Sequence, residues 1–483
     1  MAPSSSTTLT TALPADLTDY LARLDDFIAR TIEPLQARDD NNRFFDHRRE
    51  HARTDWDGHG LPRPEWEALL AQATRLADDA GFWRLSLPEQ YGGSGGSNLW
   101  MAVVREHLAA RGLGLANDLQ NEHSVVGNFP DVVMVHRFGT DAQRAELIGG
   151  RLRGEVRVTF GLTEPGHGSD ATWMETRAVR ERRSGREGWR IDGCKMWQTG
   201  MHRATHCFVF ARTSGRDGAA KGITCFVVPR ETPGIKVESY EWCVRLLSSS
   251  LSPPLPSPWT FITDHRPLNR TLNMPTDHAT VSFTNVWVPH SAILGAADAG
   301  LAVAQAFVHE NRLRQAASSL GAASYCITQS ITHANARAPF GRPLSANQAV
   351  QFPLVELATQ AEMLRLLIRA TAAEMDELLA TTTTGATTAR GEEGDDDDDA
   401  VETKLSHKVA MCNYFANRLC TDAADRAIQV HGGLGYSRHL PFEHIWRHHR
   451  RYRITEGSEE IQMRKVAMHL FGFGSSGKKE IKL

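Results

Sequence analysis

The spacing of apolar residues changes twice along the chain, and this feature constrains the fold more than any other. Up to about residue 150, apolar residues recur at three- and four-residue intervals, which is typical of amphipathic helices. From about 155 to 289, short β-branched and aromatic runs alternate with turn residues, which indicates a small antiparallel sheet or barrel. The helical period then returns in stretches long enough for a bundle. The sequence therefore predicts an α+β protein with helical, β and helical parts in that order.

These changes divide the chain, whose 483 residues exceed the usual size of a single core, into five segments. Two stretches fit neither pattern. Residues 243–271, rich in Ser, Pro and Leu, form an atypical insertion in the β part, either an extra loop or translated intron sequence. Residues 381–400 are of low complexity, and we expect a disordered loop there. The expected segments are a disordered tail at 1–16, an N-terminal helical domain at 17–154, a β domain at 155–290, a C-terminal helical bundle at 291–473 and a tail at 474–483.

The net charge of −3 conceals an uneven distribution of charged residues. Residues 390–399 (RGEEGDDDDD) hold much of the acidic excess, and the rest of the chain is mildly positive. This surplus suits an anionic ligand, but it is too small to indicate nucleic-acid binding, which we do not expect.

Cysteines and terminal sequences bear on the cellular compartment. The seven cysteines include no CxxC pair and lie mostly in apolar runs such as THCFVFA, so we expect reduced core thiols. The N-terminal stretch has neither an apolar signal core nor the arginines of a transit peptide, and no apolar stretch approaches the roughly 20 residues of a membrane span. The C-terminal EIKL shares only Lys-Leu with an SKL-type peroxisomal signal. We expect a soluble intracellular protein, in the cytoplasm or peroxisome rather than the mitochondrion.

Two common functional motifs are absent from the sequence. It contains no P-loop or HExxH pattern, which argues against ATPase and metalloprotease sites. The glycines of YGGSGGS (91–97) lack the GxGxxG spacing of a nicotinamide site and predict a loop. The histidine-rich run HLPFEHIWRHHRRY (439–452) gives no ligand set on one helical face, so we expect solvated or anion-facing surface and no metal site.

Two motifs open the β part, FGLTEPGHGSDATWMET (160–176) and GWRIDGCKMWQTG (188–200). By themselves they indicate a turn-rich loop and a strand that ends in an aromatic residue. Together they resemble the flavin-binding signature of the acyl-CoA dehydrogenase family, TEPxxGSD followed by a strand with KxWxTN/G. Three further motifs follow in the order of that family: RAPFGRPLSANQAVQ (337–351), AIQVHGGLGYS (427–437) and RYRITEGSEEIQ (451–462).

The resemblance implies an FAD-dependent protein with a helical domain, a β domain and a four-helix C-terminal domain, in which FAD lies between the β domain and the C-terminal helices. Glycines suit this site because backbone amides can approach a phosphate closely where no side chain intervenes. The residues implied to line the flavin and pyrophosphate are Phe160, Leu162, Thr163, Gly168, Ser169 and Ser458, with Trp197 and Thr199 against the isoalloxazine ring near N5.

The resemblance also implies that the FAD site is shared between subunits, and therefore a homodimer or homotetramer. Arg337, Phe340 and Gln348 match positions that reach the FAD of a neighbouring subunit. The matching pyrophosphate loop contains Gln429, Gly432 and Gly433; from the residues alone, this loop is a helix end stopped by glycine.

Three glutamates lie close together in TEGSEEIQ, near an expected helix start. From the residues alone, a capping role for Glu456, Glu459 and Glu460 is favoured, because acidic groups offset the helix dipole. The resemblance changes this for Glu456, which matches the glutamate that removes the substrate α-proton in the family's YEGTxEIQ. We therefore expect Glu456 to be the catalytic base and the other two to be structural.

The implied reaction explains why a carboxylate is needed at this position. A thioester α-C–H is too weak an acid for a solvated carboxylate, so the site must raise proton affinity by desolvation and stabilise the enolate. In the family, the base's own N–H and a ribityl hydroxyl bind the thioester carbonyl, and flavin N5 accepts the β-hydride to give a trans-2-enoyl-CoA. The implied substrate-binding residues are Arg312, Ser169 and Gly457.

Four residues depart from the family pattern. Thr455 replaces an aromatic residue before the base, and His448 replaces an acid; His309 and Asn311 differ near the CoA entrance. Some relatives carry the base near 311, but Asn311 cannot titrate, which favours Glu456. The length and branching of the acyl group therefore stay open.

Two electron acceptors are compatible with the resemblance: an electron-transfer flavoprotein, as in a dehydrogenase, or O2, as in an acyl-CoA oxidase. Nitroalkane-oxidising relatives use an aspartate base, which Glu456 disfavours. Alkylation-response relatives keep FAD and bind DNA, but this would require a positive stripe for which RHHRRYR is only one short candidate.

Overall fold

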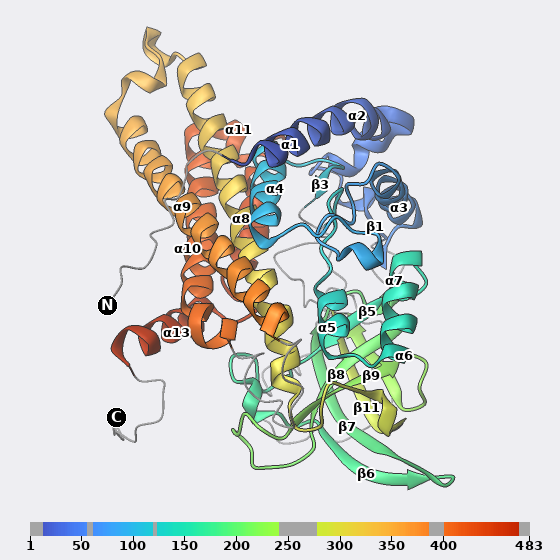
Figure 1. Ribbon diagram of the computed structural model, residues 1–483. Coiled ribbons are helices and arrows are strands. Elements are labelled where there is room, and N and C mark those ends of the chain that lie inside the picture. Colours follow the sequence, from blue (N-terminus) through green and yellow to red (C-terminus); the bar gives the residue numbers. More distant parts are fainter. Residues whose placement is uncertain (1–12, 56–60, 119–122, 241–277, 386–399, 473–483) are drawn as a thin grey trace, which may run out of the picture. The chain divides into compact units, whose positions relative to one another are not determined.

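The computed structural model describes residues 13–55, 61–118, 123–240, 278–385 and 400–472 (Figure 1). The chain divides into two compact units. The helical unit comprises Met1–Arg48, Ala68–Met134 and Ala304–Leu483, and the sheet unit comprises Arg49–Glu67 and Val135–Val303. The sheet unit thus includes residues on both sides of the expected β domain at 155–290.

The N-terminal helices follow the predicted apolar spacing. In α1 (Ala15–Phe27), Leu17, Tyr20 and Leu24 recur on one face and are buried. This helix begins within the segment expected to be a disordered tail, the first twelve residues of which lie outside the described part. The other helices up to residue 153 are α2 (Glu33–Ala37), α3 (Pro64–Asp79), α4 (Asn98–Ala110), α5 (Pro130–Phe138), α6 (Asp141–Gln143) and α7 (Gly149–Arg153).

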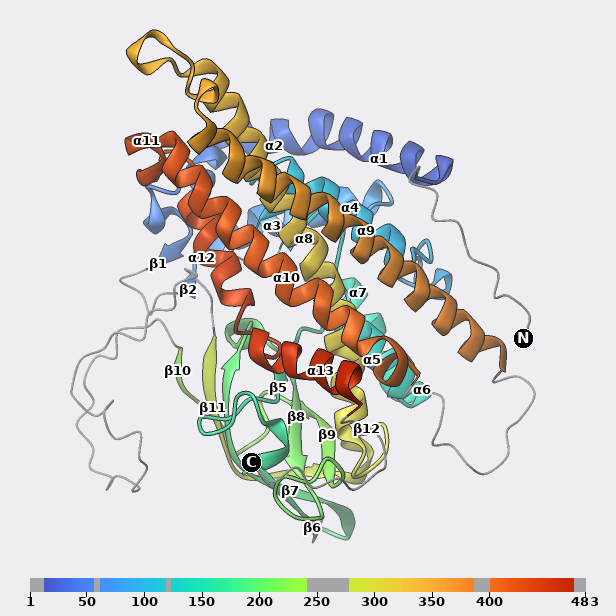
Figure 2. The same ribbon diagram turned by 90° about the vertical axis from the view of Figure 1, so that its left-hand side faces the viewer.

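Three long helices dominate the C-terminal part and run side by side in Figure 2: α8 (Gly300–Ala336), α9 (Gln348–Gly385) and α10 (Ala400–His431). The shorter α11 (Gly433–Tyr436), α12 (Phe442–Tyr452) and α13 (Glu459–Phe471) pack against α10. Buried residues of several helices share one core, for example Leu320, Leu364 and Leu419. Helix α9 continues to Gly385, so residues 381–385 are helical although a disordered loop was expected at 381–400; residues 386–399 lie outside the described part.

The sheet unit is built around an eight-stranded sheet with the order β10-β11-β7-β6-β8-β9-β12, and β5 pairs with β8. The pairs are antiparallel except for β5 with β8 and a single bridge between β6 and β8. The strands are β5 (Val158–Gly161), β6 (Arg177–Arg183), β7 (Arg186–Gln198), β8 (His206–Arg212), β9 (Ile223–Pro229), β10 (Ile235–Tyr240), β11 (Ala279–Pro289) and β12 (Ile293–Leu294).

The sheet continues past the expected end of the β domain, because β12 pairs with β9 through Ile293 and Phe226. A second contact fixes the preceding helices to this end of the sheet, since the Gln143 amide donates to the carbonyl of Ile293 at 2.9 Å. The insertion expected at 243–271 lies outside the described residues. Two short hairpins complete the described strands: β1 (Thr54–Asp55) with β2 (Leu61–Pro62), and β3 (Asn117–Asp118) with β4 (His123–Ser124).

The described cysteines are free thiols, and all of them except the half-buried Cys194 are buried. None of the helices within the described ranges is both long enough and apolar enough to cross a membrane.

Candidate active site

Glu456 lies in the turn between α12 and α13 rather than in the first turn of α13, which begins at Glu459. Its backbone has φ +57°, and that of Gly457 has φ +91°, so two successive residues are left-handed. A left-handed conformation costs a residue with a side chain about 1–2 kcal/mol. The surrounding structure must therefore hold Glu456 in this conformation, as is common at functional positions.

Hydrogen bonds from neighbouring elements hold this turn. The Arg312 guanidinium donates to the carbonyl of Glu456 through Nε at 2.9 Å and also through Nη2. The Gln462 amide of α13 donates to the carbonyl of Gly457 at 2.8 Å. A Cβ atom at position 457 would lie 2.7 Å from Arg312 Nη2, so a larger residue there would have to displace the end of the Arg312 side chain. Arg312, expected near the acyl-CoA, is 8% exposed and is seen here supporting the main chain of Glu456.

Two side-chain amides of α8 bind the carboxylate of Glu456. Its Oε1 accepts hydrogen bonds from Asn311 Nδ2 and from Gln315 Nε2, the latter at 2.8 Å. The Glu456 side chain is half-buried, whereas both amide side chains are buried. The sequence drew attention to Asn311 only as a departure and missed Gln315, although the i, i+4 spacing on one helix was a usable signal.

Glu459 has a different environment. Its carboxylate accepts hydrogen bonds from Arg453 at 2.8 and 3.0 Å and from Arg418 at 3.0 Å. The Arg453 hydrogen bonds lower the pKa of Glu459 to about 2, with Arg418 adding to the effect and burial opposing it. Glu459 is thus held as an anion within an ion-pair cluster at the start of α13.

The histidine-rich run was expected to form solvated or anion-facing surface, but His444, His448 and His449 are buried. Burial, reinforced by the nearby Arg451, lowers the pKa of His449 to about 3 and that of His448 well below its usual value. The expectation fails because α12 packs against other elements: His449 Nδ1 lies 2.9 Å from Ser319 Oγ of α8, and the ring of His444 stacks on that of His47. In the described part of the chain, no group of His, Cys, Asp and Glu side chains is arranged to hold a metal ion.

The first flavin motif runs from β5 into a loop of the sheet unit. Phe160, Leu162 and Thr163 are half-buried, whereas Gly168 and Ser169 are exposed. A Cβ atom at Gly168 would meet no other atom within 4 Å, and the backbone there is not left-handed. Packing within the protein therefore does not explain the glycine, whereas close approach of a ligand to the main chain would.

A buried ion pair joins the two flavin motifs. Lys195 Nζ of β7 lies 2.8 Å from Glu164 Oε1 and also donates to the carbonyl of Leu162 at 3.1 Å. The Glu164 carboxylate accepts two further hydrogen bonds, from the main-chain amides of Glu175 and Thr176. Burial lowers the pKa of Lys195 to about 8; burial acts to raise the pKa of Glu164, but Lys195 and the amide donors hold it below its usual value.

Trp197 and Thr199 follow directly after this ion pair. Trp197 has φ +60° and is 45% exposed, which is unusual for a residue of its size. Its ring packs edge-to-face on His278, whose Nδ1 lies 2.7 Å from Thr199 Oγ1. The strand thus presents an exposed aromatic face and a neighbouring hydroxyl, which fit the planar apolar ring and polar edge of a flavin.

The other residues predicted to bind FAD lie on the helical unit, and nearly all are exposed. Phe340 is fully exposed and left-handed, with φ +54°. Added Cβ atoms at Gly432 or Gly433 would meet nothing within 4 Å, as at Gly168. The exposed members of this set are Arg337, Phe340, Gln348, Gln429, Gly432 and Gly433, while Ser458 is half-buried.

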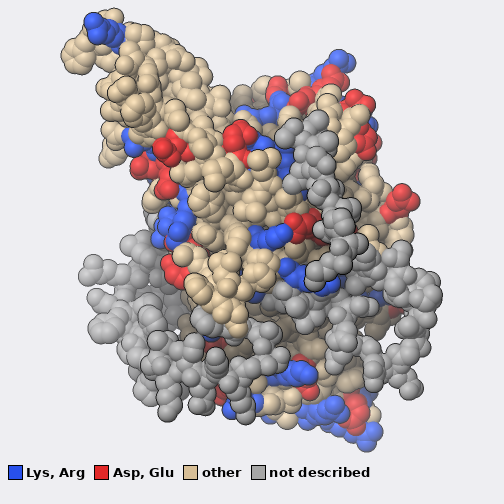
Figure 3. All heavy atoms as spheres, turned by 60° about the vertical axis from the view of Figure 1, so that its left-hand side comes forward, with Lys and Arg blue, Asp and Glu red and all other residues tan. Residues whose placement is uncertain are grey.

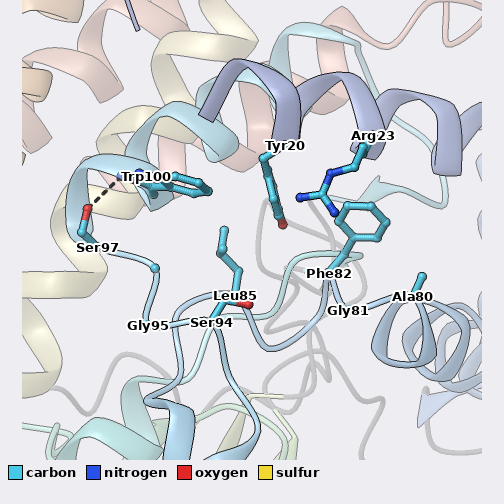
Figure 4. A pocket seen from close by; sticks show the side chains of 11 residues that line it. Tyr20, Arg23, Ala80, Gly81, Phe82, Leu85, Ser94, Gly95, Ser97 and Trp100 are labelled. Carbon is cyan, nitrogen blue, oxygen red and sulfur yellow. Dashed lines mark hydrogen bonds between the residues drawn. The ribbon is translucent and has the colours of Figure 1, made fainter. Parts of the chain in front are cut away.

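A cavity of about 460 Å³ lies elsewhere in the helical unit (Figure 4). Tyr20 and Arg23 of α1 face Phe82, Leu85 and Trp100 across it. None of the predicted site residues lines this cavity, and we assign it no role in the reaction.

Three protein-family models match the chain in succession. They are described as acyl-CoA dehydrogenase, N-terminal domain (residues 22–155), middle domain (159–249) and C-terminal domain (298–471). The chain belongs to the acyl-CoA dehydrogenase family. The predicted family, α+β fold class, oxidoreductase class and family cofactor FAD are thereby confirmed.

Individual relatives agree with this assignment. The 3-(aryl)acrylate reductase of Clostridium sporogenes is 28% identical over 391 residues, which cover 81% of this chain and 87% of that protein. The caffeyl-CoA reductase-Etf complex subunit CarC of Acetobacterium woodii is 24% identical over 387 residues, covering 80% and 86%. The structure of butyryl-CoA dehydrogenase from Megasphaera elsdenii has the same fold, with a TM-score of 0.67 and 22% identity, covering 96% of this chain and 100% of that one.

Proposed function

We propose that this member of the acyl-CoA dehydrogenase family dehydrogenates an acyl-CoA thioester to a trans-2-enoyl-CoA, with Glu456 as the base that takes the α-proton. The observation that carries the proposal is the fixation of Glu456. Its main chain is held left-handed by Arg312, and Oε1 of its carboxylate is held by Asn311 and Gln315.

Glu456 meets the main requirements of a general base. A carboxylate takes a proton efficiently when its position is fixed and its pKa is not held far below the working pH. Glu456 receives neutral amide donors, whereas Glu459, three residues later, is paired with two guanidinium groups. Because the pKa of Glu459 is held near 2, it would be a very weak base at neutral pH.

The exposed surface of the sheet unit suits the cofactor. Trp197 would stack near the isoalloxazine ring with Thr199 at its polar edge, and the amides around Gly168 and Ser169 would meet the pyrophosphate. The ion pair of Lys195 and Glu164 would keep the two segments in register. Bound FAD supplies the acceptor for the β-hydride.

We propose an electron-transfer flavoprotein as the electron acceptor rather than O2. The support is the similarity to the caffeyl-CoA reductase-Etf complex subunit, a protein whose name includes such a partner. Formation of stoichiometric hydrogen peroxide on addition of acyl-CoA in air would instead identify an oxidase.

We also propose a homodimer or homotetramer in which Arg337, Phe340 and Gln348 reach the FAD of a neighbouring subunit. The support is exposed apolar surface on the helical unit, including a stripe along α9 and the fully exposed Phe340. Figure 3, turned toward the side of α9 and α10, shows broad areas without charged side chains. The exposed apolar residues of α9 are Phe352, Val355, Met363 and Leu366.

The reductive half-reaction tests the proposed function. The purified flavoprotein is titrated without oxygen with butyryl-, isobutyryl- and octanoyl-CoA, and loss of the long-wavelength flavin absorbance is followed. We expect bleaching with at least one of these thioesters and bleaching that is slower by roughly 10²- to 10⁴-fold with Glu456→Gln that still contains FAD. Bleaching at the original rate in that variant would remove Glu456 from its role.

A further inference from the structure

We propose that Asn311 and Gln315 are positioning residues that hold Oε1 of Glu456 and so orient its carboxylate toward the α-proton. This inference rests on the proposed function of Glu456. Both side chains come from one face of α8, one turn apart, and both donate to the same carboxylate oxygen. A carboxylate oxygen offers about two lone pairs in its plane, so two donors leave Oε1 no capacity for a proton.

The orientation of the Asn311 amide is fixed from behind. Its Oδ1 accepts from Asn128 Nδ2 at 2.9 Å, so its NH2 group must face Glu456. The Oδ1 of Asn128 in turn accepts from Arg314, whose guanidinium also binds Glu310 at 2.9 Å. Because Arg314 is buried and always charged, this series of hydrogen bonds has one allowed direction, and it ends at the base.

A second series of hydrogen bonds fixes the Gln315 amide. Its Oε1 accepts from Asn413 Nδ2 of α10 at 3.4 Å, and this directs its NH2 group toward Glu456. The Oδ1 of Asn413 accepts from Asn417 at 3.1 Å and from Gln462 at 3.0 Å, so Asn413 cannot turn over without losing these bonds. Both amides therefore reach the carboxylate as obligatory donors.

Neutral hydrogen-bond donors can orient a carboxylate without lowering its proton affinity as strongly as charged donors would. They orient the carboxylate and favour its ionised form, but they leave the charge available to the incoming proton. The charged side chains on the elements around the turn are largely engaged with one another or with the main chain. Examples are Glu310 with Arg314 on α8, Arg312 with the carbonyl of Glu456, and Glu459 of α13 with Arg418 of α10 and Arg453 at the end of α12.

The test uses near-isosteric variants that remove the donors. For Gln315→Met and Asn311→Leu, we expect the acid limb of the pH profile for flavin bleaching by butyryl-, isobutyryl- or octanoyl-CoA to move upward by about one unit. The rate on the plateau should fall about tenfold, because the carboxylate is less well oriented. Gln329→Met, on the same helix, should leave both unchanged. An unmoved acid limb in both donor variants would overturn the proposal, whatever the fall in rate.

A second variant and a direct measurement of the Glu456 pKa distinguish the loss of a hydrogen-bond donor from misfolding of the variant. Gln315→Glu keeps the shape of the side chain but places a second carboxylate beside Glu456, and should move the acid limb upward by more than Gln315→Met does. Infrared difference titration of wild type against Glu456→Gln reads the pKa of Glu456 without turnover, and the same shifts should appear there. Failure of the wild-type protein to bleach would count against the proposed function, whereas normal bleaching with an unshifted Glu456 pKa in the variants would count against the amide pair alone.

Discussion

Two glutamates follow a threonine in similar local sequences, Thr163-Glu164-Pro-Gly in the sheet unit and Thr455-Glu456-Gly in the helical unit. Glu164 is almost fully buried and receives an ammonium group on one oxygen and main-chain amides on both. Glu456 is half-buried and receives two side-chain amides on one oxygen. Two carboxylates in similar sequence contexts therefore have different donors.

The difference separates a structural carboxylate from a chemically useful one. A carboxylate with a buried counter-ion and hydrogen bonds on both oxygens is held as an anion, and removing one partner leaves an uncompensated charge. A carboxylate oriented by neutral donors on one oxygen keeps its position and can still accept a proton. The predictions below probe this contrast, from the largest expected effect to the smallest.

Exchanging the carboxylate for an amide should separate the two glutamates most clearly. Glu456→Gln should slow flavin bleaching by roughly 10²- to 10⁴-fold, because it removes a general base, with little change in unfolding free energy. Glu164→Gln should show the opposite pattern, with lower stability and a bleaching rate, per bound FAD, close to that of wild type. Stopped-flow absorbance and urea denaturation measure the two quantities. Equal losses of bleaching rate in both variants would contradict the distinction between a structural Glu164 and a catalytic Glu456.

Removing the counter-ion of Glu164 should destabilise the protein strongly. Lys195→Met leaves the carboxylate buried and unpaired, and we expect a loss of about 3–5 kcal/mol in the free energy of unfolding. The double variant Lys195→Met with Glu164→Leu should recover much of this loss, since neither charge remains. Lys236→Met, which disrupts an exposed pair with Glu238 in the same unit, is the control and should cost less than about 1 kcal/mol. A small effect of Lys195→Met would show that the ion pair does not fix the flavin motifs.

Glu459 is a second ion-paired carboxylate, and its lowered pKa makes the stability of the protein depend on pH. Its pKa in the folded protein is about 2, below the unfolded value of about 4.3, so its contribution is complete above the unfolded value and is lost as pH falls toward 2. Glu459→Gln should therefore lower stability at neutral pH and flatten its decline between about pH 5 and 2. Acid titrations followed by circular dichroism, with the exposed Glu460→Gln as the matched control, would measure this; identical curves for the two variants would contradict it.

A substitution in the turn between α12 and α13, at Gly457, gives the smallest expected effect. Gly457→Ala should cost about 1–2 kcal/mol for its left-handed backbone, and the added methyl group should displace Arg312 and slow bleaching about tenfold. Gly154→Ala separates the two causes, because Gly154 has φ +79° but open space around its Cβ position. Equal rates in the two variants would show that Arg312 does not position the base.

Much of the fold and the position of the proposed base were predictable from local sequence. The strand ending at Gln198 and the three long C-terminal helices follow from apolar spacing, because periodicity depends on neighbours within a few residues. The motif containing Glu456 was visible for the same reason. The extent of the sheet unit was not predictable, because the pairing of β12 with β9 depends on residues far apart in the chain. The burial of His448 and His449 was also missed, since polar residues are buried only where a neighbouring helix satisfies or neutralises them.

The sequence by itself determined the order of helical and β segments and the family, and it singled out Glu456 among three neighbouring glutamates as the proposed base. Only the tertiary structure decided what binds its carboxylate, because Asn311 and Gln315 lie more than a hundred residues earlier in the chain and their amides are oriented by Asn128 and Asn413. Hydrogen bonds between distant side chains leave no periodic pattern in the sequence, since each depends on where the folded backbone brings a donor and an acceptor together.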